Sequence, residues 1–262
     1  MLAEEENESY GQQYEQFKNI GRQADIIMVN SSWTRNHILE LWQKPHLTFT
    51  VYPPCDVSAF NCIPLEIHNG KTRIMSIAQF RPEKNHELQI RAFHNFLERL
   101  ECLMNTTILV LIGSCRHEED YQRVQMLRNL CNELKISEKV EFKVNLTFQE
   151  IVQEMKKSIM ALHTMRDEHF GIGIVECMSA GLIMIAHNTG GPKMDIIVDY
   201  NGKKTGFLAN DINTFADAME YVWKMDPKDL DEIRTNARNS VSRFSADKFE
   251  DDFISAFKLL FI

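Results

Sequence analysis

The sequence predicts an α/β protein built on a Rossmann-like parallel sheet. Short apolar segments alternate with amphipathic stretches of about 10 to 15 residues, which is typical of parallel strands covered on both faces by helices. The clearest unit comprises an apolar segment at 158–162 (SIMAL), a helix opened by Gly171-Ile172-Gly173, and a second apolar segment at 182–186 (LIMIA). This order predicts a βαβ unit whose loop lies at the carboxyl end of its first strand, where open α/β sheets bind ligands.

The composition agrees with a globular domain and argues against several other classes. Of the 262 residues, 44% are hydrophobic and 25% are charged, as in ordinary globular proteins. The formal net charge of −8 argues against a general nucleic-acid binder, which would carry a basic surface. No apolar run approaches the roughly 18 residues of a membrane span. The six cysteines include no Cys-x-x-Cys pair, which favours reduced thiols over a disulfide framework.

The first part of the chain predicts two helices and two short strands. Apolar residues at helical spacing predict a helix within 10–24, and the apolar segment 25–30 predicts a strand. A serine N-cap then opens a second helix that ends at Trp42. A strand at 47–54 stops at two prolines, and turn formers at 55–72 indicate a connection.

From residue 73 onward, predicted strands and helices alternate regularly. This alternation places the loops that follow the strands along one edge of a single sheet. The expected strands lie at 73–80, 107–113, 139–144, 158–162, 182–186 and 206–208. The expected helices lie at about 84–100, 121–134, 151–155, 172–180, 211–224, 227–241 and 246–260.

The helix opened by Gly171 carries the chemistry of a site for a phosphate and a sugar. A helix N-terminus offers unpaired N–H groups and partial positive charge, and glycine lets the backbone approach a phosphate closely. Glu168 and Glu176 bracket this helix start, and a carboxylate can accept hydrogen bonds from two neighbouring sugar hydroxyls. Phosphate and sugar together indicate a nucleotide sugar. The residues alone leave open that both glutamates are solvated and that the glycines only form a turn.

A second loop, at residues 81–86, lies on the same predicted edge. Arg81 and Lys84 bring two cations there, and arginine suits bidentate phosphate contacts while lysine supplies a point charge. The alternative to a phosphate site is that this loop is a solvated helix start whose cations face water. His163 is interpreted as a core or loop histidine, and the Asp229-Leu230-Asp231 segment as a helix start rather than a metal site.

Three segments carry a family resemblance: FRPEKNHELQIRAF, EHFGIGIVECMSAG and AHNTGGP. They resemble the retaining glycosyltransferases of the large family that uses nucleotide sugars and the GT-B fold of two Rossmann-like domains. The spacing from Glu168 to Glu176 matches the paired-glutamate motif of that family. The resemblance extends from about Ala24 to the last residue. It is strongest to members that transfer mannose from GDP-mannose, in α-1,2 linkage, to a dolichol-linked oligosaccharide.

The resemblance implies a role for each matching residue. Arg81 and Lys84 would hold the donor diphosphate and neutralise the charge on the departing GDP. Glu168 would contact the mannose ring, so that these three residues carry catalysis, and Glu176 would bind the ribose. The resemblance implies no metal and no cofactor beyond the donor substrate GDP-mannose. The backbone of three further residues would touch the hexose and the phosphate: His169, Phe170 and Gly171.

The resemblance also implies a division of the chain. Residues 1–46 would be the remnant of an N-terminal GT-B domain and its linker, 47–245 the C-terminal nucleotide-sugar-binding domain, and 246–262 a helix that packs back toward the N-terminal domain. The chain is therefore expected to be a donor-binding half, with apolar surface exposed on strand 26–29 and on the final helix around Phe253 and Phe257.

The family's N-terminal domain would bind the dolichol-linked acceptor. The implied location is the cytosolic face of the endoplasmic reticulum membrane, in the protein N-glycosylation pathway, with contacts to other enzymes of that pathway. Two alternatives stay open: a GT-B transferase that uses another nucleotide sugar, and a non-catalytic interaction module of the same fold. Spacing alone also leaves open a glycosidase with two catalytic carboxylates, although the cationic loop favours a phosphate leaving group.

Overall fold

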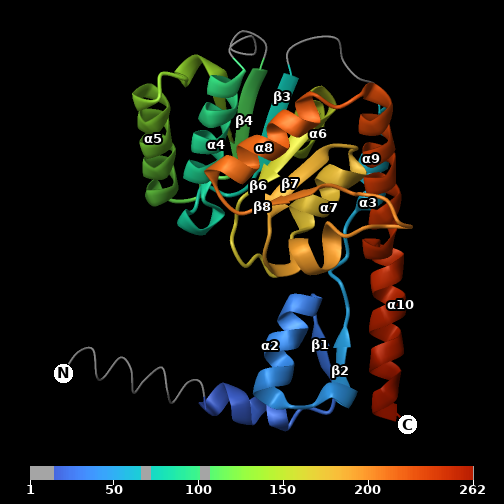
Figure 1. Cartoon of the computed structure of the whole chain (residues 1–262). Helices are drawn as coiled ribbons and strands as arrows, with labels where there is room; N and C mark the ends of the chain where they lie inside the picture. Colours follow the sequence, from blue (N-terminus) through green and yellow to red (C-terminus); the bar gives the residue numbers. More distant parts are fainter. Residues whose placement is uncertain (1–14, 66–71, 101–106, 262) are drawn as a thin grey trace, which may run out of the picture.

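The computed structural model describes residues 15–65, 72–100 and 107–261, which form two parallel sheets (Figure 1). The larger sheet has six strands in the order β5-β4-β3-β6-β7-β8, and the smaller pairs β1 with β2. The predicted α/β class with a Rossmann-like parallel sheet is therefore confirmed. The strands are β1 (Ile27–Val29), β2 (Thr48–Thr50), β3 (Thr72–Ile77), β4 (Thr107–Gly113), β5 (Val140–Val144), β6 (Met160–His163), β7 (Ile183–His187) and β8 (Phe207–Ala209).

The strand order of the larger sheet reverses between β3 and β6. From β3 the chain adds β4 and β5 on one side, and it then returns to add β6, β7 and β8 on the other. All neighbouring strands are parallel, so their carboxyl ends share one edge. Such a reversal opens a crevice between the loops that leave the two adjacent strands. The loops after β3 and β6, which carry Lys84 and Glu168, flank this crevice.

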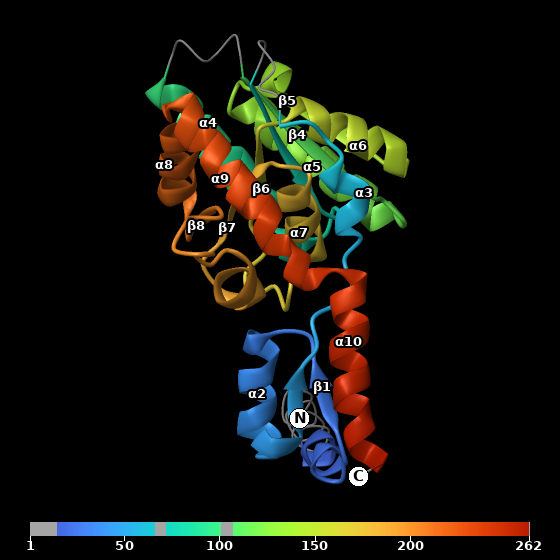
Figure 2. The same ribbon diagram turned by 90° about the vertical axis from the view of Figure 1, so that its right-hand side faces the viewer.

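Helices cover both faces of the larger sheet, because successive residues of a buried strand point to opposite faces. In β4, Leu109 and Leu111 pack with α4, α5 and α8, whereas Val110 and Ile112 pack with α3, α6 and α7. Figure 2 shows α4 and α8 on one side of the sheet and α3 and α6 on the other. The helices are α2 (Ser32–Trp42), α3 (Val57–Asn61), α4 (His86–Arg99), α5 (Glu118–Glu133), α6 (Phe148–Lys157), α7 (Ile172–Ser179), α8 (Ile212–Trp223), α9 (Pro227–Ser240) and α10 (Ala246–Phe257).

Strands β1 and β2, with α2 between them in the sequence, form a small unit (residues 27–50) that lies below the larger sheet in the view of Figure 1. The expected domain 47–245 would start with the strand that includes β2. In the structure this strand pairs with β1 instead, so it belongs to the small sheet. The division into 1–46, 47–245 and 246–262 is otherwise still a prediction.

Helix α10 runs beside β1 and β2 in both views (Figures 1 and 2). The expected exposed apolar surface is present on this helix, where Phe253 and Phe257 are 40% and 43% exposed. For the strand 26–29 the same expectation is wrong at Ile27 and Val29, which are buried where α2 and β2 pack against β1, whereas Ile26 and Met28 are partly exposed.

Candidate functional site

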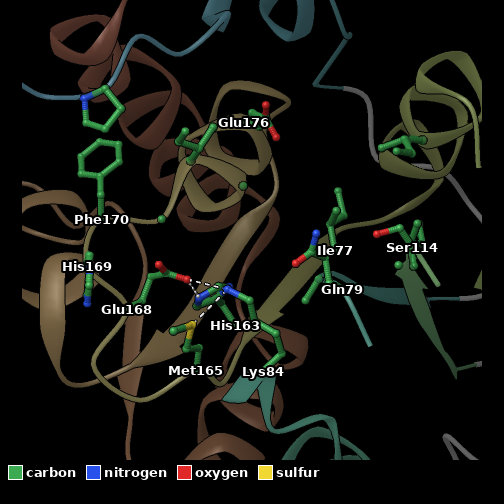
Figure 3. A pocket seen from close by; sticks show the side chains of 18 of the residues that line it. Ile77, Gln79, Lys84, Ser114, His163, Met165, Glu168, His169, Phe170 and Glu176 are labelled. Atoms are coloured by element: carbon green, nitrogen blue, oxygen red, sulfur yellow. Dashed lines mark hydrogen bonds and ion pairs between the residues drawn. The ribbon is translucent and has the colours of Figure 1, made fainter. Parts of the chain in front are cut away.

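A cavity of about 810 Å³ opens at the carboxyl ends of β3, β4 and β6 (Figure 3). This volume is typical of small-molecule sites, which range over about 300–1,000 Å³. Its walls include the loops after these strands and the first turns of α7, together with Asn30 and Pro53 from the first part of the chain and the segment that follows β5. The polar side chains along it include Gln79, Lys84, Ser114, His163, Glu168 and Glu176.

The Lys84 ammonium and the Glu168 carboxylate meet inside this cavity (Figure 3). Lys84 Nζ lies 2.9 Å from Glu168 Oε2 and 3.0 Å from Met165 Sδ. Lys84 ends a 3₁₀ turn (Pro82–Lys84), and Thr164 Oγ1 donates a hydrogen bond to its carbonyl oxygen at 2.9 Å. The backbone that carries the cation is thus tied to the loop that carries the anion. Because an ammonium group has three N–H donors and Glu168 and Met165 accept two of them, Lys84 retains one donor for a bound anion.

Glu168 is held in its charged form by its neighbours. Burial raises the pKa of Glu168, but contacts from His163 and Lys84 outweigh burial and lower this pKa to about 2. His163 Nε2 lies 3.3 Å from Glu168 Oε2 and has no hydrogen-bond partner among the described residues. His163 is buried and lines the cavity, so the interpretation of a core or loop histidine with all its hydrogen bonds satisfied is not met at Nε2. Its place at the carboxyl end of β6 was the available sign of this role.

Two glycines hold the Glu168 loop (residues 167–171) against the turn that follows β7. Gly191 N donates a hydrogen bond to Glu168 O at 2.8 Å. A Cβ atom on Gly190 would lie 2.3 Å from Glu168 O, and one on Gly191 would lie 2.4 Å from His169 O. Only glycine allows this close approach of two backbones. The Gly190-Gly191 pair therefore positions the Glu168 loop.

Helix α7 presents its N-terminus to the cavity and has its C-terminus tied to arginines. Gly171 is the N-cap, with φ 113° and no side chain to satisfy the first N–H groups. At the other end, Arg238 Nε donates to Ser179 O at 2.8 Å and Arg234 Nε to Gly181 O at 2.7 Å. Cations at the C-terminus complement the helix dipole. The free N–H groups of the first turn are thus available to an anion in the cavity.

Glu176 lies one turn further along α7 and also lines the cavity (Figure 3). Burial, and to a smaller extent the charge of Asp56, raises the pKa of Glu176. Glu168 and Glu176 are therefore in different electrostatic environments, one beside two basic side chains and one near a second carboxylate. Both carboxylates can accept hydrogen bonds from vicinal hydroxyls.

The next two residues of the Glu168 loop contact aromatic side chains outside it. His169 stacks on Trp33 with ring centroids 5.0 Å apart. Phe170 is 3% exposed and packs against Tyr52 and Phe244, at centroid distances of 5.6 Å and 5.2 Å. Because its ring is buried in this cluster, Phe170 can offer a ligand mainly its backbone, together with that of Gly171.

Arg81 is not among the residues that line the cavity. Its side chain is 39% exposed, and Nη1 lies 4.0 Å from Glu83 Oε1. The structure thus brings together six of the seven residues expected at the site and leaves Arg81 outside. The role of each of the seven residues, including that of Arg81 as a second cation at the diphosphate, is still a prediction.

Several cavity residues were not anticipated from the sequence. Ser114 and Asn145 follow β4 and β5 on the same edge, and Gln79 follows β3. The signal that could have found them is their position just after a buried strand.

Asp231 of the acidic segment lies in α9, where its Oδ1 is 3.4 Å from Arg234 Nη1. Among the residues that the structure describes, no group of three His, Cys, Asp or Glu side chains is placed to hold a metal.

Curated relatives match most of this chain. A mouse (Mus musculus) protein named GDP-Man:Man(3)GlcNAc(2)-PP-Dol alpha-1,2-mannosyltransferase is 48% identical over 246 residues, which cover 92% of this chain and 50% of the relative. The human protein of the same name is 48% identical over 92% of this chain, and that of Caenorhabditis elegans is 39% identical over 88%. The chain spans about half the length of the curated relatives it matches.

Solved structures support the fold. A glycosyltransferase from Rickettsia africae superposes with a TM-score of 0.78 at 18% identity, covering 94% of this chain and 67% of the other. Anabaena HepE in complex with UDP and glucose gives a TM-score of 0.74 at 18% identity, and the superposition covers 91% of this chain and 64% of the HepE chain. These neighbours confirm that the parallel α/β fold is that of GT-B glycosyltransferases. The family described as glycosyl transferases group 1 matches residues 63–240, and the chain therefore belongs to this family.

Proposed function

We propose that this chain forms the donor-binding part of a mannosyltransferase. The enzyme moves mannose from GDP-mannose, in α-1,2 linkage and with retention of configuration, to a dolichol-linked Man3GlcNAc2 or Man4GlcNAc2 core. The names of the relatives support this donor and acceptor. The observation that carries the proposal is the single cavity that holds Lys84, Glu168, Glu176 and the open N-terminus of α7.

The geometry suits a nucleotide sugar bound along this cavity. The donor diphosphate lies at Lys84 Nζ and the first N–H groups of α7, the ribose hydroxyls bind Glu176, and the mannose hydroxyls bind Glu168. The bond between the mannose anomeric carbon and the β-phosphate oxygen breaks, and an acceptor hydroxyl oxygen forms the new bond to that carbon. The hydroxyl proton passes to the departing β-phosphate, on which negative charge grows as the bond breaks. A preorganised cation and helix N-terminus stabilise that charge. Arg81, which lies beside Glu83 in the structure, adds a second cation when the donor is present.

The acceptor and the cellular location belong to the same proposal. The dolichol-linked oligosaccharide binds through the part of the enzyme that corresponds to the other half of the relatives, and other enzymes of the pathway are candidate partners. A lipid-linked acceptor implies a membrane surface, and we propose that this is the cytosolic face of the endoplasmic reticulum membrane. Within the described ranges, no helix combines the length and the apolar character needed to cross a membrane.

Calorimetric titration of the purified chain with GDP, GDP-mannose, UDP and UDP-glucose tests the proposal. We expect binding of the two guanosine ligands with a Kd on the order of micromolar and no heat from the uridine ligands. Glu176→Gln should weaken the binding of both guanosine ligands by about 10-fold. Glu138→Gln, at an exposed glutamate outside the cavity lining, should leave their binding unchanged. Preference for UDP-glucose would point to another donor, and a folded chain that binds none of the four would contradict the proposal.

A further inference from the structure

Asp195 uses both of its carboxylate oxygens to contact groups outside the larger sheet. It lies in the π-helical turn Pro192–Ile196, directly after the two glycines that hold the Glu168 loop, and is 5% exposed. Oδ2 accepts a hydrogen bond from Ser32 N at 2.9 Å, and Oδ1 accepts one from the Tyr52 hydroxyl at 2.8 Å. Ser32 is the first residue of α2, so the carboxylate also complements the positive end of that helix.

The turn that carries Asp195 is itself fixed on its other side. Arg243 Nη2 donates to Asp195 O at 2.8 Å and to Ile196 O at 3.1 Å. Tyr52 is equally constrained: burial, followed by the hydrogen bond to Asp195, raises the pKa of Tyr52 to about 12. Tyr52 therefore stays a neutral hydrogen-bond donor to Asp195 at physiological pH.

The same parts of the chain also meet through aromatic contacts next to the cavity. Trp33, the neighbour of Ser32 in α2, stacks on His169, and Tyr52 stacks on Phe170. His169 and Phe170 are the two residues that follow Glu168. The Glu168 loop is thus packed between the small unit with its following linker on one side and Gly190-Gly191 on the other.

We propose that Asp195 is a positioning residue, which couples the small unit to the Glu168 loop and so holds Glu168 and His169 where the hexose of the donor binds. The part of this inference that concerns the hexose of the donor rests on the proposed function. The nucleotide contacts are separate from this coupling, because Lys84 follows β3 and Glu176 lies inside α7, and neither touches Asp195, Tyr52 or Trp33 through a contact that the described residues show. Loss of the coupling should therefore affect the hexose more than the nucleotide.

Asp195→Ala tests this separation, with Asp199→Ala, at an exposed aspartate four positions on, as its matched control. The first readout needs no ligand: hydrogen–deuterium exchange of the Glu168 loop. We expect exchange there to rise about 10-fold in Asp195→Ala, with no change in the control or in β4. Tyr52→Phe, which removes one of the two hydrogen bonds, should raise the exchange less than Asp195→Ala does. Asp195→Asn should also raise the exchange less than Asp195→Ala does.

The second readout compares two affinities, for GDP and for GDP-mannose. Asp195→Ala should change the Kd for GDP by less than about 2-fold relative to the wild type and should raise the Kd for GDP-mannose by about 10-fold. Unchanged exchange in the Glu168 loop would overturn the coupling. Equal losses of GDP and GDP-mannose, together with a lower Tm, would show that Asp195 only stabilises the fold. If the wild-type chain binds neither ligand, the proposed function fails, and the exchange result alone decides whether Asp195 positions the loop.

Discussion

Lys84 Nζ and Glu168 Oε2 lie 2.9 Å apart although their residues are separated by 84 positions in the sequence. Lys84 follows β3 and Glu168 follows β6, and these strands are neighbours because the strand order reverses between them. The ion pair therefore marks the switch point of the sheet, where open α/β folds bind ligands. Each charge is preorganised by the other before a donor enters.

Removal of the Lys84 cation should weaken nucleotide binding. Lys84→Ala deletes the ammonium group that we propose as the contact of the donor diphosphate, so the Kd for GDP measured by calorimetry should rise roughly 10- to 100-fold. Lys156→Ala, at an exposed lysine in α6, is the control and should leave the Kd unchanged. Arg81→Ala should have a smaller effect than Lys84→Ala. An unchanged GDP affinity in Lys84→Ala would exclude this lysine from the diphosphate site.

Acid should destabilise the chain in part through Glu168. The pKa of Glu168 is lowered from the ordinary 4.5 to about 2 in the folded state, so its stabilising contribution is present above about pH 4.5 and is lost as the pH falls through about 2. The difference in unfolding free energy between the wild type and Glu168→Gln should therefore shrink over that window, by about 3 kcal/mol at most. Urea unfolding at several pH values measures it. A difference that is independent of pH would contradict the assigned pKa.

Gly191 should not tolerate a side chain. Its φ is −59°, so alanine costs no backbone strain, but the new Cβ would lie 2.4 Å from His169 O and 2.7 Å from Phe170 Cα. We expect Gly191→Ala to destabilise the fold by about 1–3 kcal/mol and to lower Tm. Gly202→Ala is the comparison, because Gly202 has φ 75° but open space around it, so its cost reflects backbone conformation alone. A Gly191→Ala protein as stable as the wild type would show that the loop can move away from the turn.

Arg234 should be important for stability without taking part in ligand binding. Its side chain is buried and donates to Gly181 O at 2.7 Å and to Leu65 O at 2.8 Å. Arg234→Lys replaces the forked guanidinium, which donates from Nε and Nη1, by one nitrogen atom that cannot occupy both positions. The variant should lower the unfolding free energy by about 1–3 kcal/mol, measured by urea unfolding. Arg22→Ala, at an exposed arginine, should change it by less than about 0.5 kcal/mol. A loss of GDP affinity in a fully folded Arg234→Lys protein would contradict this purely structural role.

Much of the fold could be predicted from the sequence, because strands buried on both faces are short apolar runs and their helices are amphipathic. The strand Thr107–Gly113 is observed at its predicted bounds. Helix α6 begins at Phe148, three residues before its predicted start, because Thr147 and Glu150 form a capping box. The pairing of β2 with β1 was not predictable, since an apolar strand of three residues can join either sheet.

The candidate site was predictable where a residue follows a strand or opens a helix. Lys84 and Glu168 lie together in the cavity because the parallel sheet gathers their loops on one edge, and Glu176 joins them because it lies one turn inside the helix that starts there. The orientation of Arg81 beside Glu83 depends on side-chain torsions that the sequence does not reveal. Asp195 was also missed, because its partners Ser32 and Tyr52 are 163 and 143 residues away in the chain.

A crystal structure of the chain with GDP-mannose bound tests the central claim most directly. We predict that the diphosphate contacts Lys84 Nζ and the first N–H groups of α7, that the ribose hydroxyls bind Glu176, and that the mannose hydroxyls bind Glu168. A diphosphate bound away from Lys84, or a mannose located at Glu176 with the ribose at Glu168, would contradict the account.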